Sequence, residues 1–317
     1  MTQALNYTPK AIASLASYPC PRAPLTKLGM DFIAGKLREA QVFVLADHGQ
    51  LLDREKPRPE VPLSILRPPF PVVALEYEAN TNQWPLDEYT ASKASKRIAL
   101  AWQHQPGDHS LPWMTSPPLP AGVLIASVAW YDEQQTWMPV MGAAHVAFDE
   151  GWVSPPAATP FKEAAMAAGR LNKRMASAPS LPMTMVPLFP EACFCAVRSR
   201  GASGLNDILS ADLMDEVNAY FDLCMALACR NVSTREYSAP TGLNRQRIKA
   251  GKLPLKGFHV LELFGESLGG GVASADRNAP RSHLRRGHVR RLGGERVTWV
   301  NSTIVRGRGF VDKVYAA

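Results

Sequence analysis

Apolar residues recur every three or four positions through residues 206–229. That spacing places them on one face of an α-helix, because such a helix turns once in about 3.6 residues. The members of this face are Leu209, Leu213, Val217, Tyr220, Phe221, Cys224, Leu227 and Ala228. The sequence therefore predicts a core helix over residues 206–229, and this helix constrains the fold more than any other segment.

Runs rich in β-branched and apolar residues predict strands before and after this helix. They lie at residues 41–46, 72–78, 181–189, 193–198 and 258–263. Two longer apolar runs, 122–131 and 137–148, flank the polar residues 132–135 and predict a β-hairpin.

The remaining segments complete the expected architecture. Residues 26–37 show helical spacing with Thr26 as a candidate N-cap, and residues 161–176 predict an amphipathic helix. Residues 91–102 fit a short helix, or a helix that passes into a strand. Residues 7–24 are expected to be irregular, and the proline-rich residues 53–71 to form a linker or a packed extended segment. The predicted fold class is α+β, with a mixed α/β body, β-hairpins and a long core helix, followed by a small basic β-rich C-terminal module.

The cations of the chain are concentrated toward its C-terminal end. Residues 230–317 hold 17 Lys and Arg against 6 Asp and Glu, whereas the remaining residues hold 18 against 22. This part is net +11 and the rest is net −4. With 317 residues, of which 46% are apolar, two domains are a fair expectation. We place them at 1–229 and 230–317, and expect an anionic partner only at the basic end.

Several classes of protein are disfavoured by composition. No run approaches the ~20 apolar residues of a membrane span, and the N-terminus lacks the basic and apolar regions of a secretion signal. None of the five cysteines has Cys-x-x-Cys spacing. We therefore expect reduced thiols in a cytoplasmic protein, with no membrane partner, no metal and no cofactor. His104, Asp108 and His109 form only a weak metal candidate in an expected loop, and His145 is expected in the core.

The densest run of cations lies in residues 280–301. Gly293-Gly294 stands between two β-type runs and predicts a two-residue hairpin turn, because such turns need positive φ at their centre. Residues 284–292 and 295–305 would then form an antiparallel pair. In this register the opposed residues are Leu292 and Glu295, Arg290 and Val297, His288 and Trp299, and Arg286 and Asn301.

Opposed residues share a face of a sheet. One face would therefore carry Arg286, His288, Arg290, Trp299 and Asn301, a set that suits the phosphates and unstacked bases of single-stranded RNA. The alternative is a solvated edge that discourages aggregation, with Trp299 packed beneath the arginine stems. Further candidate nucleic-acid-binding residues are Arg281, Arg285, Arg291 and Arg296, and, from an expected solvated loop or short basic helix, Arg245, Arg247, Lys249 and Lys252.

Catalytic motifs are sparse in this sequence. It contains no phosphate-binding Walker loop, no Gly-x-Ser-x-Gly elbow and no His-Glu-x-x-His helix. The one candidate catalytic pair is His283 with His288, as acid and base for RNA cleavage. Five residues apart, these two positions fall on opposite faces of a regular strand, unless a bulge at Gly287 realigns them.

Residues 280–288 read Pro-Arg-Ser-His-Leu-Arg-Arg-Gly-His. Together with six further stretches, this motif makes residues 217–315 resemble a family of phage and mobile-element proteins that includes a type V-A anti-CRISPR protein. The six stretches that also match the family are residues 223–228, 243–245, 251–255, 258–263, 265–270 and 296–299. The family pattern at the motif runs Arg-Pro-His-x-Arg-Arg-Gly-His, and Ser282 stands here where the family commonly has Pro.

The resemblance implies action during translation. The anti-CRISPR member recognises the N-terminal part of the nascent effector nuclease and brings about the loss of the mRNA that encodes it. By likeness, residues 1–229 would recognise a nascent polypeptide or a host protein, and residues 230–317 would bind mRNA or the ribosome. Degradation of the mRNA is left open between this protein and a host ribonuclease.

The leading functional hypothesis is a phage-type counter-defence or regulatory protein in the cytoplasm of a bacterial host. It would recognise a nascent protein and lower its mRNA. One rival is an intrinsic, metal-independent ribonuclease that uses His283 and His288. The other is a protein-only inhibitor whose basic patch docks an acidic partner. The sequence favours a protein that is not itself an enzyme.

Overall fold

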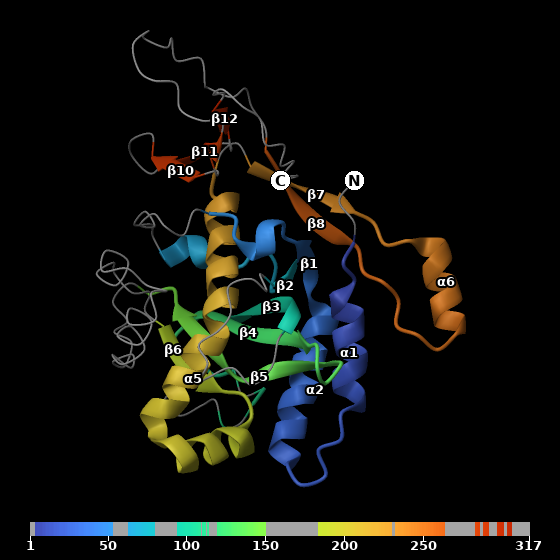
Figure 1. Ribbon diagram of the computed structural model, residues 1–317, viewed down its shortest axis with the longest axis vertical. Helices are drawn as coiled ribbons and strands as arrows, with labels where there is room; N and C mark the ends of the chain where they lie inside the picture. Colours follow the sequence, from blue (N-terminus) through green and yellow to red (C-terminus); the bar gives the residue numbers. More distant parts are fainter. Residues whose placement is uncertain are drawn as a thin grey trace.

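An eight-stranded sheet forms the centre of the molecule (Figure 1). The computed structural model describes residues 4–52, 63–79, 94–108, 110–111, 113, 119–149, 183–229, 232–263, 283–285, 288–291, 297–300 and 303–305. In chain order, the strands of this sheet are β1 (Gln41–Val44), β2 (Val72–Glu78), β3 (Ala94–His104), β4 (Gly122–Tyr131), β5 (Thr136–Ala147), β6 (Met183–Pro187), β7 (Val232–Tyr237) and β8 (Phe258–Leu263).

The strands lie side by side in the order β6-β5-β4-β3-β2-β1-β8-β7. The strands from β2 to β6 pair with one another in antiparallel fashion, whereas β1 is parallel to both β2 and β8. β7 pairs with β8 in antiparallel fashion and forms one edge of the sheet. Helices cover both faces of this mixed sheet, which gives the α+β fold that the sequence predicts.

Most of the expected strands are confirmed. They are the strands expected at residues 41–46, 72–78, 181–189 and 258–263, and the hairpin of β4 and β5. The helical interpretation of residues 91–102 is wrong from residue 94 on, because β3 occupies that part and pairs with both β2 and β4, whereas residues 91–93 lie outside the described residues. Residues 98–102 are buried on both faces of the sheet. In such a central strand, burial outweighs the local helical preference of alanine.

Two helices, α1 (Tyr7–Ser17) and α2 (Pro24–Glu39), cover one face of the sheet. The expectation of irregular structure at residues 7–24 is wrong over α1. Ala11, Ile12 and Leu15 recur at helical spacing and are buried, and Pro9 lies in the first turn, where no intrahelical N–H is lost. Helix α2 confirms the helix expected at residues 26–37.

At the N-terminus of each of these helices, backbone N–H groups donate to the carboxylate of a glutamate from another element. The backbone N–H of Thr8 in α1 donates to the Glu76 carboxylate of β2 at 2.7 Å. In α2, the backbone N–H groups of Leu25 and Thr26 donate to the Glu191 carboxylate, each at 2.8 Å. Thr26 is therefore not the N-cap, a position held by Ala23, and its hydroxyl also donates to Glu191. Carboxylates at these ends satisfy free N–H groups and complement the helix dipole.

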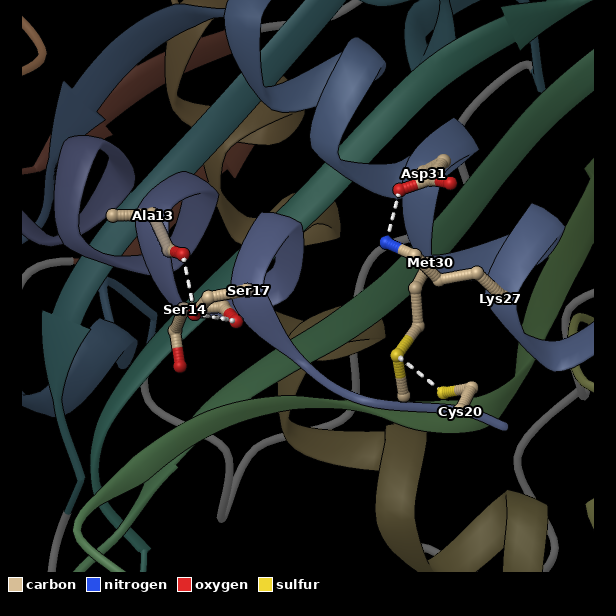
Figure 2. A network of polar contacts seen from close by, with 7 residues as sticks. All are labelled: Ala13, Ser14, Ser17, Cys20, Lys27, Met30 and Asp31. Atoms are coloured by element: carbon tan, nitrogen blue, oxygen red, sulfur yellow. Dashed lines mark hydrogen bonds and ion pairs between the residues drawn. The ribbon is translucent and has the colours of Figure 1, made fainter. Parts of the chain in front are cut away.

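Short local contacts hold the connection between α1 and α2 (Figure 2). The Ser17 hydroxyl donates to the carbonyl oxygens of Ala13 and Ser14 at the end of α1, at 3.0 and 3.1 Å. The Cys20 thiol lies 3.8 Å from the sulfur of Met30. All five cysteines are free. This turn therefore depends on backbone capping and packing rather than on a covalent link.

Helix α5 (Pro190–Leu227) covers the opposite face of the sheet. It confirms the core helix expected at residues 206–229, and Leu209, Leu213 and Val217 are buried. The strand expected at residues 193–198 is wrong, because this segment forms the first turns of α5, before a break at Gly201 with φ of 74°. Two short 3-10 helices, η1 (Asp47–Gly49) and η2 (Leu63–Leu66), lie against α5.

The sheet continues past residue 229 into the basic part of the chain. β8 pairs with β1, with Phe258 opposite Val42 and His259 opposite Phe43. β7 was not expected, because its polar sequence lacks an apolar alternation; it is an edge strand with several exposed residues. Two strands of the predicted C-terminal module, β7 and β8, therefore belong to the central sheet. The predicted domain boundary at residue 230 stays a prediction, which concerns the separation of functions.

One expected element, the helix at residues 161–176, lies outside the described residues. Among the helices that the structure describes, none combines the length and the apolar content needed to cross a lipid bilayer.

Candidate nucleic-acid interface

A basic excursion, residues 238–257, connects β7 to β8 and is here called the basic arm. It contains helix α6 (Thr241–Lys249), which stands out from the sheet on the side away from α5 (Figure 1). The arm carries Arg245, Arg247, Lys249, Lys252 and Lys256 and no Asp or Glu. None of the α6 residues is buried, so packing against a core does not explain why this helix is formed.

Polar contacts within the arm fix the helix against its own return segment. The Asn244 side chain pairs with the backbone of Leu255: its amide donates to the carbonyl at 2.9 Å, and its oxygen accepts the N–H at 2.7 Å. One turn later, the Arg247 Nε donates to the Leu253 carbonyl at 2.8 Å. A single amide and a single guanidinium therefore hold two antiparallel segments together without an apolar core.

The end of α6 is closed by a glycine in the left-handed region. Gly251 has φ of 66°, a conformation that costs little only for glycine. Its N–H donates to the Ile248 carbonyl at 3.0 Å, and the Lys252 N–H donates to the Arg247 carbonyl at 2.9 Å. These two bonds form a Schellman cap, which satisfies carbonyls that would otherwise be free and turns the chain back toward β8.

Lys256 attaches the arm to the body. Its ammonium donates to the carbonyl oxygens of Arg38 and Ala40, at 2.7 and 2.6 Å, at the junction of α2 with β1. Burial lowers the pKa of the Lys256 ammonium, and the nearby carboxylates of Glu76 and Glu39 partly oppose this shift. Lys256 is thus committed to the end of α2, although it belongs to the same run of cations.

The remaining cations of the arm are free. Arg245, Lys249 and Lys252 are exposed, and within the described part of the chain their side chains make no hydrogen bond or ion pair. Arg245 and Lys249 lie four residues apart and therefore share one side of α6. Arg247 is half-buried because it faces the return segment. Of the four arm residues predicted to bind nucleic acid, three are available and Arg247 is partly engaged.

At the base of the arm, a further cation, Arg235, is already paired with a carboxylate. Arg235 of β7 forms an ion pair of 3.1 Å with Glu262 and lies 5.4 Å from the ring centroid of Tyr237. Tyr237 stacks on Phe258 with 5.0 Å between ring centroids and 7° between planes.

Sequence reasoning did not assign roles to Asn244 and Lys256. A glycine two residues after the end of α6 is the sequence signal that predicts where this helix stops.

The second basic element is the C-terminal hairpin, which the structure describes through its backbone pairing. Strand β9 (His283–Arg285) pairs with β12 (Thr303–Val305), and β10 (His288–Arg291) pairs with β11 (Val297–Val300), all antiparallel. The expected antiparallel pair is therefore confirmed. Arg281, Arg286, Arg296 and Asn301 lie outside the described residues, so their assignments stay predictions.

The predicted register of this hairpin is wrong by one residue. Trp299 lies opposite Val289 rather than His288, and Arg290 lies opposite Thr298 rather than Val297. Arg291 pairs with Val297, and residues 292–296 between them lie outside the described residues. A glycine pair is compatible with hairpin loops of more than one length, so the sequence alone does not set the register.

A shift of one residue moves positions to the other face of a strand pair. The positions of Trp299, Val289 and Arg291 therefore share one face, and those of His288 and Arg290 share the other. The single face predicted from the sequence, with Arg286, His288, Arg290, Trp299 and Asn301 together, does not form in this register. Cationic positions are present on both faces instead.

Comparison with protein-family models, with curated proteins and with solved structures finds no match to this chain. The candidate interface therefore has to be judged on its own chemistry.

The candidate catalytic histidines lie on different strands. His283 is in β9 opposite Val305, and His288 is in β10 opposite Val300. Among the described residues, no three His, Cys, Asp or Glu side chains gather in a way that could hold a metal ion. Neither observation gives the hairpin a defined acid–base pair.

His145 is a core histidine, as the sequence predicts. It is fully buried, its Nε2 lies 3.0 Å from the Pro120 carbonyl oxygen, and its ring meets that of His104 edge-on at 5.6 Å. Burial lowers the pKa of His145 to about 4, so the ring is neutral near pH 7. His109 lies outside the described residues.

A buried polar cluster joins α5 to the sheet. Arg97 of β3 forms an ion pair of 2.9 Å with Glu216 of α5, and the Tyr77 hydroxyl donates to the same carboxylate oxygen at 3.1 Å. Burial raises the pKa of Tyr77, which keeps its hydroxyl protonated as a donor. Because Glu216 is fully buried and Arg97 nearly so, this cluster fixes α5 on the sheet and does not offer a surface to a large partner.

Proposed function

We propose that this protein binds RNA, either mRNA or the RNA of the ribosome, through its basic C-terminal region and lowers the expression of a selected transcript. The observation that carries the proposal is the basic arm. It contains an exposed helix without a buried residue, held in place by polar contacts of the arm, and it presents the side chains of Arg245, Lys249 and Lys252 without partners among the described residues. Clustered unpaired cations on one element attract phosphates.

The wider role follows the resemblance of residues 217–315 to the phage family described above. The protein would act in the cytoplasm of a bacterial host as a counter-defence or regulatory factor. Residues 1–229 would recognise a nascent polypeptide or host protein, while residues 230–317 hold the RNA. Because His283 and His288 lie on different strand pairs in the described part of the hairpin, the proposal assigns cleavage of the transcript to a host ribonuclease.

The experiment that tests this role compares reporter transcripts in bacteria that express the protein. A library of reporters with different N-terminal coding regions is sequenced with and without the protein, and each reporter is paired with a copy whose start codon is blocked. The proposal predicts that a subset of transcripts falls only when it is translated. Equal abundance of every transcript in both strains would contradict it.

A second measurement separates an RNA-binding factor from a ribonuclease. Purified protein is incubated with a naked transcript in EDTA, and the RNA is resolved on a denaturing gel. The proposal predicts an intact transcript. Cleavage that His288→Ala abolishes would establish the rival, a metal-independent ribonuclease.

A further inference from the structure

We infer that Arg245, Lys249 and Lys252 form a phosphate-binding row that holds the RNA backbone without reading its sequence. This inference deepens the proposed function and rests on it. It assigns the binding contacts to three residues of the arm, and it excludes the other cations of the same run from direct contact.

The exclusion follows from the contacts already made. Arg247 uses its Nε to hold Leu253, and Lys256 uses its ammonium to hold the end of α2. Arg235 is paired with Glu262. Lys256 and Arg235 would have to give up these partners to bind a phosphate, and the Nε bond of Arg247 turns its guanidinium toward the return segment. Arg245, Lys249 and Lys252 lose only water when they bind, so they supply most of the favourable free energy.

The placement of the row suits a backbone. Arg245 and Lys249 are one helical turn apart, with about 6 Å between their Cβ atoms. Lys252 is part of the Schellman cap through its N–H bond to the Arg247 carbonyl, so its backbone is held in a fixed position relative to the helix. Three cations on one rigid support can therefore engage successive phosphates with little loss of conformational freedom in the protein backbone.

The arm lacks the groups that read bases. Between Tyr237 and Phe258 there is no aromatic residue on which a base could stack. The Asn244 amide is already paired with Leu255. In duplex RNA, the narrow major groove keeps side chains from base edges. Contact through the arm is thus governed by charge, and its affinity should depend steeply on salt and weakly on sequence.

The test measures binding of fluorescein-labelled RNA by anisotropy, with the full-length protein, from 50 to 300 mM KCl. Two single strands of equal length are used, one of uridine alone and one of mixed sequence. The test variant is Arg245→Ala/Lys249→Ala/Lys252→Ala. Its control, Lys10→Ala/Arg22→Ala/Arg198→Ala, removes the same charge from exposed positions on α1, α5 and the turn before α2.

Each phosphate contact with a single strand contributes about 0.7 to the slope of log K against log salt. Loss of three contacts should therefore reduce the slope by about 2 and weaken binding about 10- to 100-fold at low salt, equally for both strands. The control should keep the wild-type slope. Melting temperatures of both variants should match the wild type, because exposed charges contribute little to stability.

The outcomes separate the inference from the proposed function. If the wild type binds neither RNA, both fail. If the wild type binds and the test variant keeps its affinity and slope, the inference fails while the function survives with its contacts elsewhere. A loss confined to the mixed sequence would overturn the claim that the backbone alone is held. Preference of the row for a poly-glutamate peptide over RNA at equal charge would overturn RNA as its partner in favour of an acidic protein.

Discussion

At the scale of single residues, the sheet depends on close approaches that a sequence does not reveal. Gly122 begins β4, and a Cβ placed there would collide with the Val146 carbonyl and with the His145 ring. By contrast, a Cβ at Gly35 in α2 would meet nothing within 4 Å. Both residues are glycines in regular elements, so only the structure distinguishes one that is required from one that is replaceable.

Gly122→Ala is expected to destabilise the protein by about 1–3 kcal/mol, the usual range for overpacking. Gly35→Ala should be neutral or stabilise by up to about 1 kcal/mol, because alanine favours a helix interior over glycine. Urea unfolding of the two variants measures both values. Equal stability of the two variants would show that the contact between β4 and His145 relaxes freely.

A second residue-scale prediction concerns Asp212 on α5. Burial raises the pKa of its carboxyl to about 6, and Glu216 adds to the shift while Arg97 opposes it. A carboxyl whose pKa is raised on folding binds its proton more tightly in the native state. Its contribution to stability is therefore complete at low pH and is lost as the pH rises through about 6.

Asp212→Asn removes this titration. Relative to the wild type, the variant should gain stability between pH 5 and pH 7.5, as followed by thermal melts across that range. Asp132→Asn, a change on the exposed turn between β4 and β5, serves as the control. A difference between Asp212→Asn and the wild type that does not change with pH would contradict a raised pKa of this carboxyl.

At the scale of elements, the sequence predicts the helices and strands whose apolar residues are spaced so that one face is buried. The core helix of α5 and the hairpin of β4 and β5 belong to this group. It misjudges β3, where alanine-rich sequence is buried on both faces, and the first turns of α5, where Cys193 is buried and Cys195 is exposed. Local preference in these segments is weak, so packing decides.

In the candidate interface, too, the sequence predicts some features and misses others. Charge alone was sufficient to predict a basic C-terminal region, and it pointed to Arg245, Lys249 and Lys252. It could not show that Arg247 and Lys256 are engaged, because their partners are backbone carbonyls. Nor could it set the hairpin register, which depends on the length of one loop.

Asn244 is the residue on which the order of the arm depends most. Asn244→Ala removes both bonds to Leu255 and should loosen α6, while the global melting temperature stays close to the wild type because α6 buries nothing. Limited trypsin digestion followed by mass spectrometry should show faster cleavage at residues 245–252. Gln246→Ala, which removes an exposed amide from the same helix, is the control. Equal cleavage of the two variants would contradict the assigned role.

At the scale of the whole molecule, charge and architecture divide the chain differently. The charge changes sign near residue 230, but β8 completes the sheet beside β1, and Phe258 and Val260 are buried in the core. The basic arm therefore connects two strands of the central sheet, β7 and β8. The arm is also held to the end of α2 through Lys256.

A truncated chain ending at residue 229 should consequently be unstable. It leaves β1 as an open edge and removes buried apolar side chains, whereas a chain ending at Leu263 retains the whole sheet. Thermal melts should show a cooperative transition near that of the full chain for residues 1–263 only. A cooperative and equally stable 1–229 fragment would show that the body folds without β7 and β8.

The central claim is that the basic arm contacts RNA in translating cells. Ultraviolet crosslinking followed by mass spectrometry of the crosslinked peptides tests it directly, because the adducts report which residues touch RNA. The account predicts RNA adducts on peptides from residues 238–257, with their loss in Arg245→Ala/Lys249→Ala/Lys252→Ala. Recovery of no RNA adduct, or of adducts confined to residues 1–229, would contradict it.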